Sequence, residues 1–391
     1  MTAVGAWGRA DTDAVRDVLE QIAQYGIVGG ADARLVDVGS EGYVACFARE
    51  VLDGLLPYGG ATCRFFEGSY GSGKTHLLRL LEATARDRGL AVVRTELTHD
   101  LGLEDWRPIA QHIFTSLEAT IAGASVRGLS AILAALHKSD YADVDALRAA
   151  RLPHAGFQAA MLRAATVARI PSPLRRFLSG ERVRIAELGK AGVKGVKDPL
   201  SARNAELALV TVLGGLSHLG MPGTLLLFDE NESSFFAPKS PTRKLRTAAN
   251  IMRRLVDGCT TGNLAGTAAV FAVLPNFLNE CAHQYPALGQ RLEMPALRQG
   301  ISWRWPVLPV TAVTSLAEPE DFLDAALARL AALLAECGCD PAAVVKATTR
   351  MDAAGMTVLA EHAGSGYRRP LMKRLATIAL DTMEGVRSTH E

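Results

Sequence analysis

Two stretches of the chain carry residue types suited to phosphate and metal chemistry. The first is a glycine-rich loop at 68–75, GSYGSGKT, which fills every fixed position of the Walker A pattern GxxxxGK[ST]. The second is the end of GTLLLFDE, a Walker B-like run in which Asp229 and Glu230 follow apolar residues. Together they predict a site for a nucleoside triphosphate and its metal ion.

Each residue type in the glycine-rich loop has a physical reason. Glycines let the loop turn backbone N–H groups toward phosphate oxygens, and the helix that starts there adds its positive end. Lys74 can reach the β- and γ-phosphates, and the Thr75 hydroxyl can ligate Mg²⁺. The expected nucleotide contacts are Gly68, Ser69, Tyr70, Gly71, Ser72, Gly73, Lys74, Thr75 and His76. The alternative is a glycine turn that merely precedes a helix.

The acidic pair favours hydrolysis of the nucleotide. Ligands of open α/β sheets lie beyond the carboxyl ends of the strands, which is where both acids are expected. Asp229 would hold Mg²⁺ through water, and Glu230 would orient and polarise the attacking water. An acid pair after a strand is common, so this assignment depends on the loop upstream. The pair disfavours a kinase and favours the ATPase class that includes AAA+ machines.

Four further residues are candidates by position in such an ATPase. Asn276 follows GTAAVFAVLP and either senses the γ-phosphate or caps the next helix. Arg291 either reaches a neighbouring subunit's nucleotide or forms a surface salt bridge. Arg368 and Arg369 open a helix after the turn GSGY, where one of them contacts nucleotide or both bind the acids of a partner.

The elements that must position these residues alternate along the chain. Strands are expected at ATCRFFEG, LAVVRTEL, GTLLLFDE, 266–275 and, as an edge or connecting strand because of its prolines, SWRWPVLPV. Helices are expected at 11–25, 40–55, 74–89, 103–121, 201–219, 243–257, 318–336, 341–362 and 368–384. The alternation predicts an α/β fold with a parallel sheet, of the P-loop NTPase (AAA+-like) kind, followed by a C-terminal helical lid.

Three parts are predicted from this pattern. They are an N-terminal helical segment (1–34), an ATPase core (35–310) and a C-terminal helical lid domain (311–391). The core contains a helical, basic insertion without a clear strand (122–200).

Composition is that of an ordinary globular protein, with 49% apolar and 21% charged residues and a net charge of +1. No apolar run reaches the ~18 residues of a membrane span, and MTAVGAWGRADTDAV lacks a signal pattern. The six cysteines lack CxxC spacing. A cytoplasmic protein without membrane or zinc is expected.

Positive charge is concentrated at 151–200. This stretch contains three acids (Glu181, Glu187, Asp198) and ten Lys or Arg: Arg151, Arg163, Arg169, Arg175, Arg176, Arg182, Arg184, Lys190, Lys194 and Lys197. The part from Arg175 to Lys197 is a candidate site for double-stranded DNA, with binding to the phosphate backbone. The alternatives are a solvated face and a contact to an acidic partner protein.

Several stretches resemble the ATP-binding proteins of bacterial BREX-type phage-defence operons. The resemblance rests on RFFEGSYGSGKTHLLRLLEATARDRGLAVVRTELT, GTLLLFDENES, RTAANIMRRLVDG and GYRRPLMKRL, and above all on the YGxGKTH form of the loop. It runs over most of 35–385 and is weak at 122–200. It implies an AAA+ ATPase of the initiator-loader type, with protein partners of a defence operon.

The function expected is therefore Mg-ATP binding and hydrolysis by an AAA+-type motor, loader or switch in a phage-defence complex. ATP or ADP and Mg²⁺ are the expected ligands, and a homo-oligomer is a candidate assembly. The rival is a non-hydrolysing, nucleotide-gated scaffold that recruits effector proteins. A small-molecule or protein kinase is a third interpretation, disfavoured because the sequence contains no visible acceptor-binding motif.

Overall fold

The computed structural model describes residues 11–387, except 99, 140–141, 230–240, 294–304, 314–315, 317 and 363–365. Two compact units make up the chain. The first contains Met1–Ala45, Glu67–Leu80 and Leu308–Glu391, and the second contains Cys46–Phe66 and Leu81–Val307. The glycine-rich loop therefore belongs to the same unit as the C-terminal helices, while Asp229 belongs to the other.

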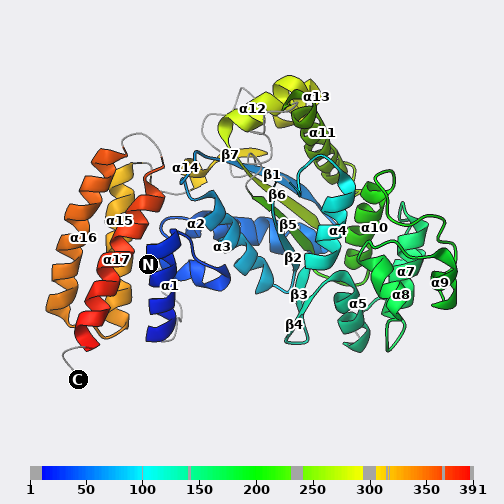
Figure 1. Ribbon diagram of the computed structural model, residues 1–391, viewed down its shortest axis with the longest axis horizontal. Helices are drawn as coiled ribbons and strands as arrows, with labels where there is room; N and C mark the ends of the chain where they lie inside the picture. Colours follow the sequence, from blue (N-terminus) through cyan, green and yellow to red (C-terminus); the bar gives the residue numbers. More distant parts are fainter. Residues whose placement is uncertain are drawn as a thin grey trace. The chain divides into compact units, whose positions relative to one another are not determined.

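Seven strands form one sheet in the order β4-β3-β2-β5-β6-β1-β7 (Figure 1). They are β1 (Thr62–Glu67), β2 (Ala91–Glu96), β3 (Glu118–Ile121), β4 (Ala124–Arg127), β5 (Thr224–Asp229), β6 (Thr267–Val273) and β7 (Val307–Pro309). β2, β5 and β6 run parallel, with Glu96 opposite Asp229. The expected α/β architecture is confirmed, and β7 lies at an edge, where Pro309 is tolerated.

The antiparallel hairpin β3–β4 corrects two expectations. The helix expected over 103–121 ends at Ser116, and a strand lies inside 122–200, which was expected to be helical without a clear strand. Ala122 and Gly123 connect β3 to β4 with φ angles of 50° and 79°. A two-residue hairpin turn with both φ angles positive usually has Asn-Gly or Asp-Gly at its centre. Because alanine is unusual at this position, the turn could not be recognised from the sequence.

Three phenylalanines tie the central strands together. The ring of Phe271 on β6 stacks at 5.0 Å on Phe65 of β1 and at 4.5 Å on Phe228 of β5. All three side chains are fully buried. In β5 and β6, apolar residues follow one another without alternating with polar ones, a pattern that is typical of strands covered on both faces.

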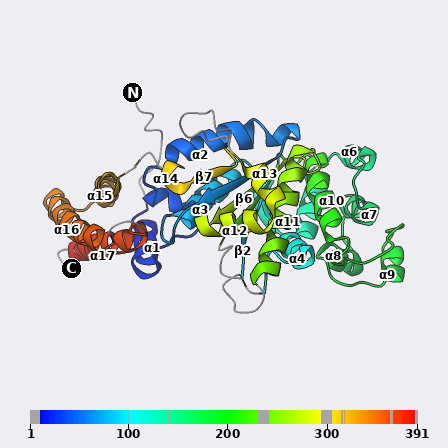
Figure 2. The ribbon, with the colours of Figure 1, turned by 90° about the horizontal axis from the view of Figure 1, so that it is seen from above.

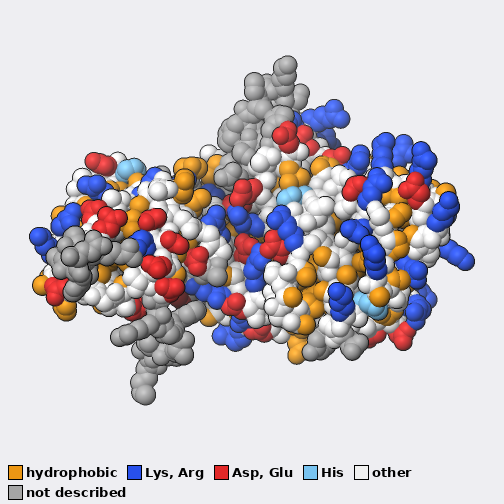
Figure 3. Space-filling model, turned by 60° about the horizontal axis from the view of Figure 1, so that its bottom comes forward, with side chains coloured by type: hydrophobic (Ala, Val, Ile, Leu, Met, Phe, Trp, Pro, Cys, Tyr) orange, Lys and Arg blue, Asp and Glu red, His pale blue; other side chains and the backbone are white. Residues whose placement is uncertain are grey.

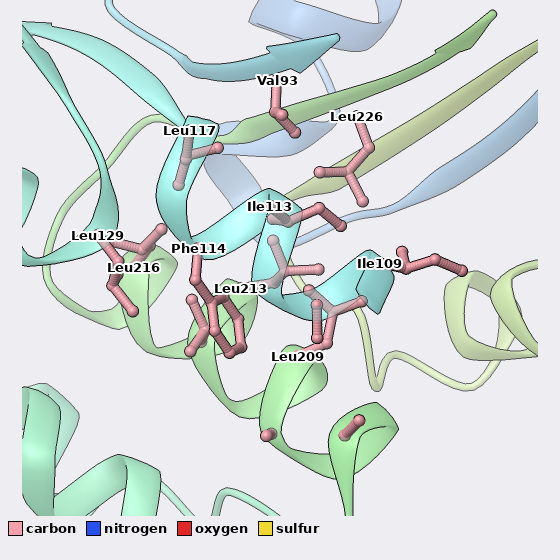
Figure 4. Close-up of a cluster of buried hydrophobic side chains, with 14 of the residues drawn as sticks. Val93, Ile109, Ile113, Phe114, Leu117, Leu129, Leu209, Leu213, Leu216 and Leu226 are labelled. Carbon is pink, nitrogen blue, oxygen red and sulfur yellow. The ribbon is translucent and has the colours of Figure 1, made fainter. Parts of the chain in front are cut away.

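Helices α4 (Trp106–Ser116) and α10 (Ala205–His218) pack on β2 and β5. In Figure 4, apolar side chains of both helices form one cluster with Val93 of β2 and Leu226 of β5, and Phe114 of α4 points toward α10. The buried positions recur at three- and four-residue spacing: Ile109, Ile113, Leu209, Leu213 and Leu216.

The other helices of the second unit form two groups. The first follows the hairpin and comprises α5 (Leu129–Lys138), α6 (Val144–Ala149), α7 (Ala155–Ala165), α8 (Ser172–Leu178) and α9 (Ile185–Lys190). The second comprises α11 (Pro241–Thr260), α12 (Pro275–Gln284) and α13 (Pro286–Leu292), which pack on one another (Figure 2). Helix α2 (Glu41–Phe47) begins in the first unit and continues in the second as the π-helix η2 (Ala48–Asp53), followed by η3 (Leu56–Tyr58).

In the first unit, a helix near the N-terminus packs against the C-terminal helices. Helix α1 (Thr12–Tyr25) packs on α17 (Arg368–Arg387), which also packs on α15 (Pro319–Glu336) and α16 (Pro341–Glu361) (Figure 1). Their shared core includes Leu19, Leu330, Met351 and Leu375. The three expected C-terminal helices are confirmed, although α17 extends past the expected end at 384 to Arg387. This unit also contains η1 (Gly30–Val36), α14 (Val310–Val313) and the start of α3 (Lys74–Arg86).

No helix in the described ranges is both long and apolar enough to span a lipid bilayer.

We expect Phe271→Ala to lower the free energy of unfolding of the second unit by roughly 3–5 kcal/mol, because it leaves a cavity between two stacked rings. Tyr58→Ala is the control, since that side chain is 84% exposed; it should change stability by less than about 0.5 kcal/mol. Urea unfolding measures both. Equal losses would contradict the stacked arrangement.

Candidate functional site

The glycine-rich loop connects β1 to the first residue of α3. Gly71 and Gly73 have φ angles of 76° and 98°, which side-chain-bearing residues rarely adopt. Helix α3 begins at Lys74, and amides in the first turn of a helix have no acceptor within that helix. The loop therefore combines glycine turns with a helix N-terminus, as an anion-binding site requires.

Lys74 holds its ammonium group against this loop. Its Nζ donates to the carbonyl oxygens of Gly68, at 2.7 Å, and of Ser69, at 3.1 Å. The residue is only 8% exposed. A phosphate oxygen bound in the loop would therefore lie close to this positive charge.

Ser72 brings a second polar group into the loop. Its Oγ is buried and has no hydrogen-bond partner among the described residues. A Cβ on Gly68 would overlap this Oγ, so a side chain at that position would displace the Ser72 hydroxyl. An unsatisfied buried hydroxyl beside a glycine cradle fits an oxygen-rich ligand such as a phosphate.

A turn before α17 touches the loop closely. A Cβ on Gly71 would lie 2.8 Å from the carbonyl oxygen of Gly366, and a Cβ on Gly366 would lie 2.7 Å from that of Tyr70. Gly366 also has a positive φ of 76°. Glycine on both sides thus permits two backbone segments to meet.

Arg368 follows this turn and is buried, with 8% of the residue exposed. Its Nη1 donates to the carbonyl oxygen of Ser72 at 3.3 Å, and its guanidinium carbon lies 4.7 Å from the ring centroid of Phe322. The guanidinium group thus reaches the glycine-rich loop from the C-terminal helices.

Arg369 points to different partners. Its Nη1 donates to the hydroxyl of Tyr70 at 3.1 Å, and its Nε and Nη2 donate to the carbonyl oxygen of Tyr25 at 3.2 and 2.7 Å. Tyr25 ends α1, so a cation lies at the negative end of that helix. The two arginines therefore have separate surroundings, which their adjacency in sequence does not indicate.

His76 and Asp37 form a pair, of which the sequence predicted only His76 as a site residue. The Nε2 of His76 lies 3.1 Å from Oδ1 of Asp37, whose side chain is only 5% exposed. Glu67, the last residue of β1, was also missed; burial raises the pKa of its carboxyl group. Neither acid belongs to a recognisable motif, so spacing alone offered no signal for them.

In the second unit, Asp229 ends β5 and is 2% exposed. Its Oδ2 lies 4.0 Å from Nη1 of Arg94 on β2. Arg94 also contacts Glu96 at 2.7 Å and Glu82 at 3.5 Å. Asp229 therefore has a cationic neighbour that the sequence did not single out. Glu230, the expected base, lies outside the described residues.

Asn276 is the second residue of α12 and is exposed. Leu274 occupies the N-cap position, so the capping role considered for Asn276 does not apply. The strand before it, β6, lies beside β5 as expected. Arg291 on α13 donates from Nε to Oδ1 of Asp257 at 2.8 Å, and Arg253 binds the other carboxylate oxygen at 2.6 Å.

Residues 12–136 match the family of the BREX system ATP-binding protein BrxC/D. The matched span contains α1, the glycine-rich loop, α3 and Arg94. The resemblance to BREX ATP-binding proteins is thereby confirmed for this span. No curated protein and no solved structure matches the chain.

The substitutions Gly71→Ala and Gly59→Ala distinguish the cost of backbone strain from the cost of the close contact with Gly366. Both glycines have a φ angle of 76°, but a Cβ on Gly59 would meet nothing within 4 Å. Gly59→Ala should cost about 1–2 kcal/mol of unfolding free energy. Gly71→Ala should cost roughly 1–3 kcal/mol more, from the clash with Gly366. Equal costs in denaturant titrations would contradict a tight contact.

Proposed function

We propose that the chain binds Mg-ATP at the glycine-rich loop and hydrolyses it, as an AAA+-type motor, loader or switch in a BREX-type phage-defence complex. The observation that carries the proposal is the glycine-rich loop at 68–75, which lies between a strand and a helix and holds the Lys74 ammonium group inside it. The match of this span to an ATP-binding family supports it.

In this proposal the loop binds the phosphates through its own groups. Lys74 exchanges its two carbonyl acceptors for β- and γ-phosphate oxygens, so the charge stays hydrogen-bonded throughout. The Ser72 hydroxyl and the amides at the start of α3 add neutral donors. Gly68, Ser69, Tyr70, Gly71 and Gly73 shape the loop, and His76 supports the first turn of α3 through Asp37.

Thr75 and Asp229 are the proposed ligands of Mg²⁺, one through a hydroxyl and the other through water. A hydroxyl and a carboxylate suit this hard cation. The ion would neutralise charge on the β- and γ-phosphates. Glu230 is the proposed base, which orients a water molecule toward the γ-phosphate.

Arg368 is the proposed sensor from the helical lid. It reaches the loop at Ser72, and cation–π contact with Phe322 holds its guanidinium group there. Arg369 takes a supporting role, because its donors are used by Tyr25 and Tyr70. Asn276 remains the proposed polar group at the end of β6.

The proposed partners are further copies of this chain, proteins of a defence operon and double-stranded DNA. Arg291 is the candidate finger for a neighbouring subunit's nucleotide, released from Asp257 on assembly. A non-hydrolysing scaffold is the alternative, and ATP-dependent complex formation with turnover near zero, even with partners present, would favour it.

Lys74→Ala should weaken ATP binding by roughly 10- to 100-fold, because it removes a charged donor. Glu230→Gln should bind ATP normally and lose about 10²–10⁴-fold in hydrolysis. Binding by calorimetry and phosphate release under single-turnover conditions measure the two steps separately. Wild-type turnover in Glu230→Gln would exclude Glu230 as the base.

Arg291→Ala should reduce turnover by about 10³-fold where ATP assembles the chain, as expected of a trans-acting arginine. Arg253→Ala is the matched control, since it removes the other partner of Asp257. Mixing Arg291→Ala with Lys74→Ala should restore activity, because each supplies what the other lacks. Failure of the mixture, with assembly intact by sizing, would contradict a role in trans.

A further inference from the structure

The segment 175–197 carries positive charge that ATP chemistry does not use. It contains seven Lys or Arg and two Glu, a net charge of +5 in a chain whose total is +1. All seven cations are exposed. Figure 3 shows Lys and Arg side chains gathered over the region of α7, α8 and α9.

Six of these cations have no ion-pair partner among the described residues. Arg176 differs, because its Nε binds Glu181 at 2.8 Å. The six, which we call the basic face, are Arg175, Arg182, Arg184, Lys190, Lys194 and Lys197. Like charges gathered without counter-ions repel one another, and a bound polyanion relieves that repulsion.

The backbone beneath the basic face is anchored to the core. Val183 is 8% exposed and separates Arg182 from Arg184, so the extended chain turns both arginines to the same side. Val193 and Val196 are buried beside the exposed Lys194 and Lys197. Buried apolar residues thus hold the cations outward, and little backbone ordering is needed on binding.

We propose that the basic face binds the phosphate backbone of double-stranded DNA. The two aromatic side chains nearest in the chain, Phe157 and Phe177, are fully buried, so bases of a single strand have no ring to stack on. Ile185 is the only large apolar side chain of 175–197 that is strongly exposed. Aromatic residues are enriched at the centre of protein interfaces, and the one aromatic residue of 175–197, Phe177, is buried.

We expect this face to contact phosphates more than base edges. The segment contains no Asn or Gln, the side chains that read adenine through paired hydrogen bonds, so guanine, which pairs with Arg or Lys, is the base that it could read. Its charges suit phosphate contacts, which position a protein on the duplex without reading it. This is the binding mode of a protein that moves along, or is loaded on, DNA of any sequence.

Fluorescence anisotropy with a labelled DNA duplex of mixed sequence tests the proposal. With the six cations on phosphates, log K should fall with log salt at a slope of about −5. The triple variant Arg182→Glu, Lys194→Glu, Lys197→Glu should reduce that slope by about 3 and weaken binding at least about tenfold. A matched control reverses three exposed cations elsewhere: Lys138, Lys346 and Arg374.

Three outcomes would overturn the proposal: equal losses in both triple variants, no duplex binding by the wild type at about 50 mM salt, or preferred binding of double-stranded RNA or polyglutamate. The proposal deepens the proposed function by assigning its DNA partner to a surface, and it does not depend on ATP binding. Lys74→Ala should therefore bind the duplex as the wild type does, so failure of ATP binding and failure of DNA binding are distinguishable.

Discussion

Lys74 keeps its ammonium group inside the glycine-rich loop at 8% exposure, and a charge withdrawn from water this far must have hydrogen-bond acceptors. The carbonyl oxygens of Gly68 and Ser69 supply them. Those carbonyls face the ammonium because the loop curls at Gly71 and Gly73, whose φ angles are positive. The loop is thus folded around its own cation, with its shape defined before any anion binds.

The same curl lets the C-terminal helices approach. Gly366 and Gly71 meet backbone to backbone, and a side chain on either would separate them. Once they meet, Arg368 lies against Ser72 and Arg369 against Tyr70. A shift of the turn before α17 would move both arginines and would therefore change their contacts with Ser72 and Tyr70. In the proposed ATPase, a shared contact of this kind would couple the C-terminal helices to the glycine-rich loop.

How far the sequence predicts this arrangement depends on how local the signal is. The loop, β5 and the long C-terminal helices follow from patterns within 6–21 residues, and these elements were predicted correctly. The β3–β4 hairpin was missed because Ala122 occupies a turn position that usually requires Asn or Asp. Asp37, Arg94 and Gly366 act through contacts with residues distant in sequence, and no spacing rule locates such partners.

Arg94 illustrates what such a partner contributes. Asp229 is almost fully buried and faces Glu96 across the β2–β5 ladder, so two carboxylates would meet at the strand ends without a counter-ion. Arg94 contacts both, and its bond to Glu96 is the shorter. At 4.0 Å, the contact between Arg94 and Asp229 is an electrostatic attraction rather than a hydrogen bond. Arg94 thus offsets part of the cost of burying Asp229, the carboxylate that we propose as a ligand of Mg²⁺.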